Sequence, residues 1–190
     1  MNNLDFHKPV MLKEVLAHLA PKAGEVYCDA TFGAGGYSKA ILASADCKLY
    51  AIDRDESAQK FAAKLKEKFA KNFVFLPGKF SEIKNLLSQE GASQLDGMVF
   101  DIGVSSMQLD DKERGFSFDS DAKLDMRMDQ KSFPSAFEIV NEASEEELAK
   151  IIKEFGEEPK AKRIAKKIIE ARKLQPVTSC RDLANIVRSL

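Results

Sequence analysis

DIGVSSMQLD at residues 101–110 follows the apolar run GMVF at residues 97–100. An acidic residue that ends an apolar strand, followed by glycine and small hydroxyl side chains, is typical of a site beyond the strand tips of an open α/β sheet. The segment DATFGAGGYS at residues 29–38 has the same form. Together the two segments predict an α/β fold in which one strand tip holds a nucleotide-type cofactor and another carries the chemistry.

Size and composition indicate an ordinary globular protein with a sizeable core. The chain has 190 residues, of which 44% are hydrophobic and 31% charged. Its net charge is −1, so any surface that contacts nucleic acid must be local. The three cysteines show no metal-ligand spacing, which favours a reduced, cytoplasmic protein without a metal site. We expect neither a signal peptide nor a membrane span.

Strand-like and helical segments alternate through the first two thirds of the chain. The strand candidates are residues 25–29, 48–53, 72–76 and 96–101. Helical segments between them, the last beginning near Ser81, predict parallel strands joined by right-handed crossovers. Beyond residue 133 the pattern is helical and includes a capping box from Ser144 to Glu147. We therefore expect a cofactor-binding domain at residues 1–133 and a helical insertion domain at residues 134–190.

The glycine turn at residues 33–36 predicts a close backbone approach to a ligand, or alternatively a tight packing turn. Asp53 ends the second strand, where an acid can accept both hydroxyls of a ribose, whereas Asp55 suits a helix-capping role. The turn lacks the dinucleotide fingerprint and a Walker-type lysine. A cofactor with ribose and adenine but no pyrophosphate fits better, and S-adenosylmethionine is the obvious candidate.

Several further motifs occur in a fixed order. They are His7-x-Pro9-Val10-Met11, residues 29–36, Ile52-Asp53-Arg54-Asp55, residues 101–110, Arg114-Gly115-Phe116-Ser117-Phe118 and Leu124-Asp125-Met126-Arg127-Met128-Asp129. Together they closely resemble the MraW/RsmH family of bacterial ribosomal RNA cytosine-N4 methyltransferases. The resemblance covers essentially the whole chain, and the last three motifs are jointly highly specific.

The resemblance implies a class I, Rossmann-like methyltransferase fold with a helical insertion domain. It implies methyl transfer from S-adenosylmethionine to the exocyclic N4 amine of a cytosine in small-subunit (16S) ribosomal RNA. The positions that it implies for cofactor binding are Gly35, Gly36, Tyr37, Asp53, Phe80, Asp101 and Gln108. The family usually has histidine where this chain has Tyr37, and we expect cofactor binding to survive because the backbone does much of the work in such a turn. Phe80 suits either the adenine or the core.

The resemblance also implies a seven-stranded sheet, of which only four strand candidates are present. We therefore expect an incomplete sheet and a chain that corresponds to an N-terminal portion of the family. An uncovered strand edge promotes association, which predicts self-association or a homodimer.

Candidate catalytic residues follow from the same motifs: Asp101, Ser105, Ser106, Asp125 and Arg127. Asp101 suits an acceptor that stabilises the amine as positive charge develops, or a contact to the methionine part of the cofactor. Asp125 and Arg127 suit the amine and a phosphate, or a salt bridge that fixes their loop.

A basic segment at residues 160–173 suggests a solvated helix face or a surface that contacts RNA phosphates. The resemblance favours the RNA contact, made by Lys160, Lys162, Arg163, Lys166 and Lys167. The target base must be single-stranded or flipped out to be reached. Two alternatives remain open: a binding-only module that holds cofactor or RNA, and a methyltransferase for another amine.

Overall fold

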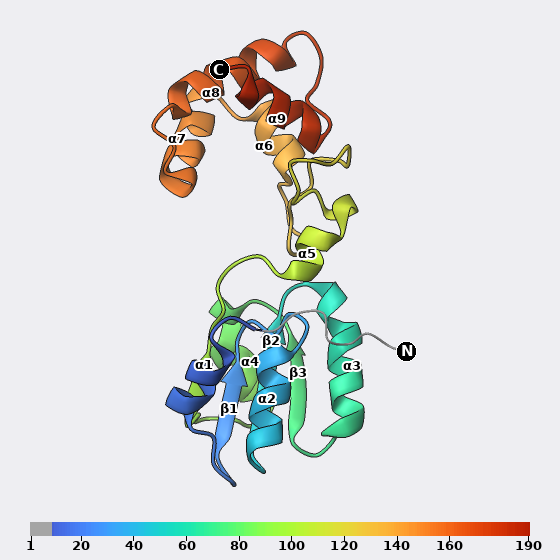
Figure 1. Cartoon of the computed structure of the whole chain (residues 1–190), viewed down its shortest axis with the longest axis vertical. Helices are drawn as coiled ribbons and strands as arrows, with labels where there is room; N and C mark the ends of the chain where they lie inside the picture. Colours follow the sequence, from blue (N-terminus) through green and yellow to red (C-terminus); the bar gives the residue numbers. More distant parts are fainter. Residues whose placement is uncertain (1–8) are drawn as a thin grey trace. The chain divides into compact units, whose positions relative to one another are not determined.

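The structure is a computed structural model that describes residues 9–190, and His7 lies outside them. The chain divides into two compact units, with the division after Met107 (Figure 1). This division differs from the domain boundary predicted at residue 133. Residues between 108 and 133 belong with the helices because Leu124 is buried in the helical core and the Cys180 thiol donates to the Gly115 carbonyl at 3.2 Å.

The first unit is built on a four-stranded parallel sheet. Its strands are β1 (Val26–Asp29), β2 (Lys48–Asp53), β3 (Phe73–Pro77) and β4 (Gly97–Val99), in the order β3-β2-β1-β4. The α/β fold with parallel strands is thus confirmed. The chain leaves β1 towards β2 and β3 and then returns to the other side of β1 with β4. This reversal creates a switch point between β1 and β4, where ligands bind in open α/β sheets.

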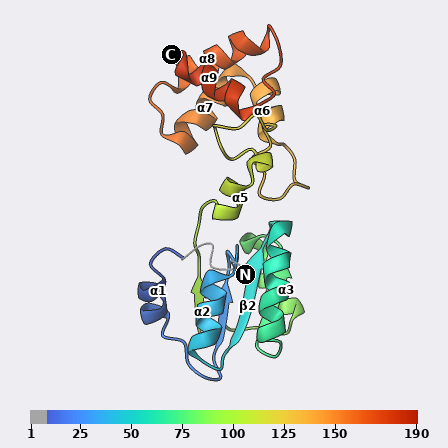
Figure 2. The same cartoon turned by 45° about the vertical axis from the view of Figure 1, so that its right-hand side comes forward.

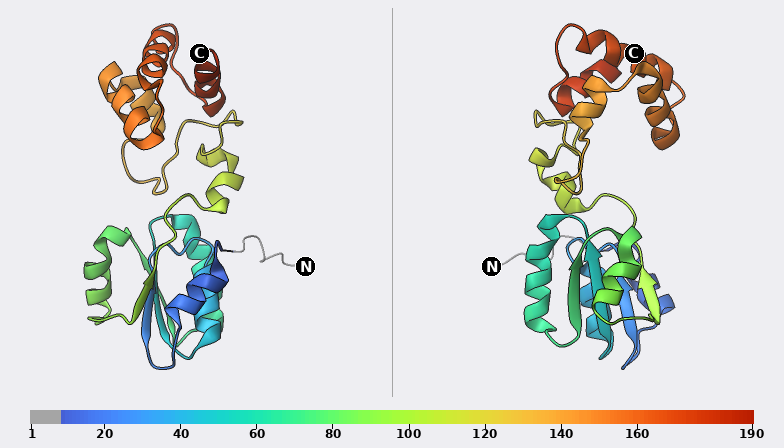
Figure 3. Two further views of the ribbon diagram at one scale, coloured as in Figure 1. Left: turned by 60° about the vertical axis from the view of Figure 1, so that its left-hand side comes forward. Right: turned by 180° about the vertical axis from the view of Figure 1, so that it is seen from behind.

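Helices cover both faces of this sheet (Figures 2 and 3). One face carries α1 (Leu12–Leu19), α2 (Gly36–Ser44) and α3 (Gln59–Lys68), and the other carries α4 (Ile83–Gln89). Short 3₁₀ turns, η1 (Glu56–Ala58) and η2 (Phe80–Glu82), precede α3 and α4. Successive residues of β2 alternate between the two cores: Leu49 packs on the α2 side and Tyr50 on the α4 side. Burial on both faces explains why the strands are apolar throughout.

The second unit is helical. Its elements are α5 (Ser106–Asp110), which spans the boundary, η3 (Lys112–Arg114), α6 (Ala136–Glu142), α7 (Glu145–Gly156), α8 (Ala161–Arg172) and α9 (Cys180–Arg188). Helix α8 buries a stripe of Ala161, Ile164, Ala165 and Ile168 against the neighbouring helices. No helix within residues 9–190 is long and apolar enough to span a membrane.

The capping box predicted at the start of α7 is confirmed. The Ser144 hydroxyl accepts the Glu147 backbone N–H at 3.2 Å, and the Glu147 carboxylate accepts the Ser144 N–H at 2.8 Å. Ser179 and Asp182 form the same reciprocal pair at the start of α9.

Candidate functional site: strand tips and a braced loop

The predicted site residues fall in both units, and each group is described within its own unit. The first unit holds Gly35, Gly36, Tyr37, Asp53, Phe80, Asp101, Ser105 and Ser106, and the second holds Gln108, Asp125 and Arg127. The first group lies at or beyond the carboxyl ends of the strands, and Asp125 and Arg127 lie in the loop before α6.

Gly35 and Gly36, in the turn between β1 and α2, leave no room for side chains. Gly33 and Gly35 have φ angles of 54° and 81°, which are left-handed values that favour glycine. A Cβ on Gly35 would lie 2.7 Å from the Phe32 ring, and one on Gly36 would lie 2.3 Å from Pro9 Cγ. The turn leads into the N-terminus of α2, whose first N–H groups have no partner within the helix. Such a turn suits close approach of a ligand to the backbone.

Asp29 braces this turn from within the core. Its side chain is fully buried at the end of β1 and accepts the Ser38 hydroxyl at 2.7 Å and the Thr31 N–H at 3.3 Å. Burial raises the pKa of Asp29 to about 6. The sequence analysis assigned no role to Asp29, although its position at the end of β1 matches that of Asp53 at the end of β2.

The Asp53 side chain binds the backbone of two segments, the turn after β1 and the turn after β2. Its carboxylate accepts the Gly33 N–H at 2.7 Å and the Asp55 N–H at 2.8 Å. Burial raises the pKa of Asp53, and these two hydrogen bonds oppose that effect. A carboxylate has about four acceptor positions, so two remain for ligand hydroxyls. Asp55 accepts the Ser57 N–H at 2.9 Å and caps η1, which confirms its predicted role.

The tip of β4 is exposed. The Asp101 N–H donates to Thr31 Oγ1 at 2.7 Å, which fixes the backbone while the side chain faces solvent. Phe80 packs edge-to-face against Phe100, with ring centroids 5.8 Å apart. Phe80 is 45% exposed, so the alternative that it is a core aromatic is wrong.

Tyr37, Ser105 and Ser106 lie close to the glycine turn in sequence or in space. Tyr37 is buried in the first turn of α2, and its hydroxyl donates to the Val10 carbonyl. Burial raises the pKa of Tyr37, with the carboxylates of Asp101 and Asp29 adding to the effect. Ser105 Cβ lies 4.0 Å from the place that a Cβ on Gly33 would take, and Ser106 begins α5.

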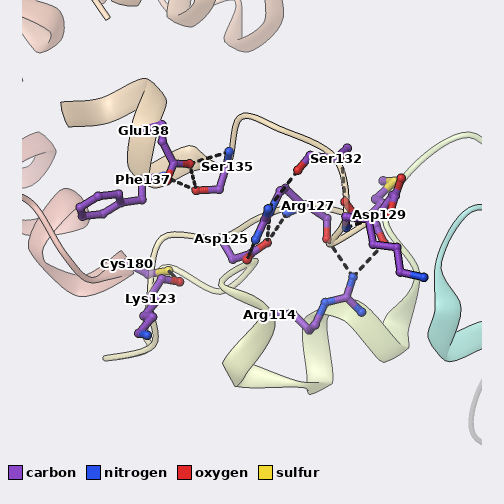
Figure 4. Close-up of polar contacts among 12 residues, drawn as sticks. Arg114, Lys123, Asp125, Arg127, Asp129, Ser132, Ser135, Phe137, Glu138 and Cys180 are labelled. Carbon is purple, nitrogen blue, oxygen red and sulfur yellow. Dashed lines mark hydrogen bonds and ion pairs between the residues drawn. The ribbon is translucent and has the colours of Figure 1, made fainter. Parts of the chain in front are cut away.

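In the second unit, Asp125 and Arg127 bind each other (Figure 4). Arg127 Nε donates to Asp125 Oδ1 at 3.0 Å, and its Nη2 lies 2.5 Å from Oδ2. Arg127 Nη1 also donates to the Ser132 carbonyl at 2.9 Å. The guanidinium holds the pKa of Asp125 below its usual range. The structure therefore contains the salt bridge that was the second predicted role for this pair.

Arg114 supports the same loop from a buried position. Its Nη2 donates to the carbonyls of Arg127 at 2.8 Å and Met128 at 3.1 Å (Figure 4). Gly115 follows with a φ of 73°, and a Cβ there would lie 2.5 Å from the Lys123 carbonyl oxygen. The sequence analysis quoted this motif without assigning Arg114 a role. Gln108, predicted to bind the cofactor, is buried in α5.

The basic residues of α8 and its start form an exposed surface opposite the buried stripe. They are Lys160, Lys162, Arg163, Lys166 and Lys167, all exposed. Arg163, Lys166 and Lys167 line a hollow of about 240 Å³ together with Glu170 and Leu190. Lys167 pairs with Glu170 at 3.2 Å.

The fold is that of a parallel α/β protein whose strand tips place carboxylates beside a glycine turn. A helical unit follows it in the chain. The chain belongs to the MraW methylase family, whose model matches residues 5–190.

Named relatives support this assignment. The chain is 52% identical over 184 residues to "Ribosomal RNA small subunit methyltransferase H" of Wolbachia sp. subsp. Drosophila simulans (strain wRi), covering 97% of this chain and 63% of that protein. It is 50% identical to the protein of the same name from Paramagnetospirillum magneticum, covering 97% and 58%. The chain thus spans about 60% of the length of these curated relatives. A solved rRNA methylase from Streptococcus thermophilus matches at 16% identity over 54% of this chain and 61% of that chain; its TM-score of 0.43 is too low to add to the argument.

Proposed function

We propose that this chain is an S-adenosylmethionine-dependent methyltransferase that acts on the N4 amine of a cytosine in small-subunit ribosomal RNA. The observation that carries the proposal is the family match over residues 5–190, together with about 50% identity to relatives named for methylation of small-subunit ribosomal RNA. The four-stranded sheet is then part of a class I methyltransferase fold, and the helical unit is the insertion domain.

The strand tips of the first unit fit the cofactor. The glycine turn leads into the N-terminus of α2, whose first backbone N–H groups have no partner within the helix and suit a ligand. Asp53 accepts the ribose hydroxyls through the acceptor positions that Gly33 and Asp55 leave open. Phe80 offers an exposed ring to the adenine. Gly35, Gly36, Tyr37, Asp101 and Gln108 complete the proposed cofactor contacts.

Asp101 is the proposed acceptor for the cytosine amine. S-adenosylmethionine supplies an electrophilic methyl group when it is bound. The exposed Asp101 carboxylate accepts a hydrogen bond from the amine, stabilises the positive charge that develops on nitrogen and takes up the released proton. The backbone bond from Asp101 to Thr31 holds the residue in place for this role. Ser105 and Ser106 position the base or its loop.

RNA binding is proposed for the second unit. Asp125 and Arg127 fix the loop before α6 through their ion pair, and the partly exposed guanidinium remains within reach of a phosphate. The basic residues of α8 and its start contact the RNA backbone; they are Lys160, Lys162, Arg163, Lys166 and Lys167. They are exposed and have few acids among them, so they form a local basic surface although the net charge of the chain is −1.

Self-association is proposed from β4. This strand ends the sheet order, and Met98 and Phe100 near it are 40% and 46% exposed. An open strand edge with apolar side chains favours a second copy of the chain. Light scattering at high concentration tests this, and a strictly monomeric mass would contradict it.

Transfer of a radioactive methyl group from S-adenosylmethionine to small ribosomal subunits tests the proposed activity. We expect the chain to label the RNA, and Asp101→Asn to reduce the rate by at least about a hundredfold because the acceptor loses its charge. Asp46→Asn, an exposed acid of the same unit, is the matched control. Cofactor binding without any transfer would instead favour the binding-only module, an alternative raised by the span of about 60% of the relatives' length.

A further inference from the structure

Phe118 presents an aromatic ring to solvent from a motif that the proposed function leaves unused. Its side chain is 68% exposed, although it lies only four positions after the buried Arg114. The guanidinium of Arg188, near the end of α9, lies 5.7 Å from the centre of the Phe118 ring. The molecule therefore displays an aromatic ring and a cation together at one place on its surface.

The backbone beside Phe118 is held against α9. The Arg181 N–H donates to the Ser120 carbonyl at 3.0 Å, and the Cys180 N–H donates to the Ala122 carbonyl at 3.1 Å. Arg181 and Arg188 are seven positions apart, so they project from the same face of the helix. One meets Asp121 and the other meets the Phe118 ring. The chain is thus held against α9 at Ser120 and Ala122, directly after the ring.

Two acids and two arginines lie near the ring, and the arginine at the ring itself is not the one that pairs with the acids. Asp119 and Asp121 are the acids next to it, and Arg181 lies 3.7 Å from the first and 2.8 Å from the second. Arg188 is exposed, and its Nη1 donates a long hydrogen bond of 3.5 Å to Asn185 Oδ1. Unpaired bases stack on aromatic rings and on arginine planes, and a guanidinium can also bind a phosphate.

We propose that Phe118 and Arg188 form a platform on which an unpaired base of single-stranded RNA stacks. This inference rests on the proposed RNA substrate and adds a contact that lies outside both the strand tips and the basic surface of α8. The ring supplies the stacking face, and the guanidinium supplies a second plane and a positive charge beside it. Stacking of this kind is tolerant of sequence, so the platform positions the strand rather than choosing the target base.

A tryptophan reporter tests the platform because the chain has no tryptophan of its own. We would place tryptophan at Phe118 and, as a matched control, at Phe155, which is 83% exposed near the end of α7. The probe is a single-stranded, cytosine-containing oligoribonucleotide, with binding followed in parallel by the anisotropy of a labelled copy. We expect saturable quenching for Phe118→Trp, at the same RNA concentrations as the anisotropy change, and none for Phe155→Trp.

Alanine variants give the size of the effect. Phe118→Ala should weaken RNA binding roughly tenfold, whereas Phe155→Ala should change it less than about twofold. RNA binding with no quenching of Phe118→Trp, or equal quenching at both sites, overturns the platform and leaves the RNA substrate standing. If neither probe responds and the chain binds no RNA by anisotropy, the platform and the proposed substrate both fail, while S-adenosylmethionine binding still reports on the cofactor site.

Discussion

The pKa values of carboxylates in the two units are shifted in opposite directions. In the first unit, burial raises the pKa of Asp29 and Asp53. In the second unit, hydrogen bonds lower the pKa of Asp125 and Asp182. Asp29 is buried and Asp53 half-buried at the strand tips, whereas the second pair braces a loop and caps a helix. The contrast separates acids whose pKa is governed by burial from acids whose pKa is governed by hydrogen bonds.

The cause of the contrast lies in the partners of each acid. Asp29 accepts only neutral donors, a hydroxyl and backbone N–H groups, so the cost of burying its charge dominates. Asp125 instead meets the Arg127 guanidinium through two side-chain contacts. Burial-raised pKa values such as those of Asp29 and Asp53 are typical of functional sites, whereas the Arg127 ion pair gives Asp125 a structural partner.

Arg114→Met should have the largest effect, and it tests how firmly the second unit depends on its bracing. The substitution keeps much of the side-chain volume and removes two charge-assisted hydrogen bonds to the Arg127 and Met128 carbonyls. We expect the free energy of unfolding of this unit to fall by about 4 kcal/mol. Hydrogen exchange in α6 and α7 measures this free energy. Lys112 is exposed in η3, and Lys112→Met should change the free energy of unfolding by less than about 0.5 kcal/mol.

The pH dependence of stability tests the contrast directly. Asp29 has a folded pKa of about 6, above the unfolded value of about 3.9, so the folded first unit holds the proton more tightly. Its contribution is fully present below about pH 4 and is lost as the pH rises through 6, a change of about 3 kcal/mol. Asp53 acts in the same direction, whereas the lowered pKa of Asp125 makes the second unit lose stability as the pH falls.

Denaturation followed by tyrosine signals measures the stability of the first unit at each pH, because the only tyrosines of the chain, Tyr27, Tyr37 and Tyr50, all lie in that unit. Asp29→Asn should flatten the slope between pH 4 and 6, and Asp46→Asn should leave it unchanged. Because Asp53 leaves a residual slope, only a slope as steep in Asp29→Asn as in the unchanged chain would show that Asp29 does not titrate as its burial implies.

Asp53→Ala should weaken S-adenosylmethionine binding by about 2 kcal/mol, or about thirtyfold, through loss of two hydroxyl contacts. Calorimetric titration measures the affinity, with NAD as the unrelated cofactor. Asp55→Ala is the matched control, because it removes a neighbouring carboxylate that caps η1. Equal losses for the two variants would mean that Asp53 supports the turn without touching the ligand.

The sequence predicted the sheet well because its strands are buried on both faces. β2 has the predicted bounds, and β1 and β3 differ from prediction by one residue at one or both ends. β4 is shorter than expected, because beyond Val99 the chain turns away and the Asp101 N–H bonds the Thr31 side chain. Ser81 was expected to begin a helix near the third crossover and instead lies inside η2.

The remaining misses involve contacts that are distant in sequence. The predicted domain boundary at residue 133 differs from the division after Met107 because the packing of residues 108–133 depends on contacts such as that of the Cys180 thiol with the Gly115 carbonyl. A buried role for Arg114 is similarly invisible, since arginine is ordinarily exposed. The ribose role of Asp53 was predicted from its strand tip, most other cofactor roles came from motif resemblance, and all of them remain predictions. The brace by Asp29 became visible only from its burial and hydrogen bonds.

The smallest predicted effect compares one substitution in two structural settings. Ser144→Ala removes the hydroxyl that accepts the Glu147 N–H at the start of α7, and we expect a loss of about 1 kcal/mol in the second unit. Ser88 lies inside α4, where its hydroxyl donates to the Lys84 carbonyl. Ser88→Ala should therefore be neutral or stabilise the first unit by a few tenths of a kcal/mol, because alanine is the better helix former. Chemical denaturation followed by tyrosine signals for the first unit and by hydrogen exchange for the second should give opposite signs. A loss at both sites would show that the hydroxyls act through general packing and not through the cap.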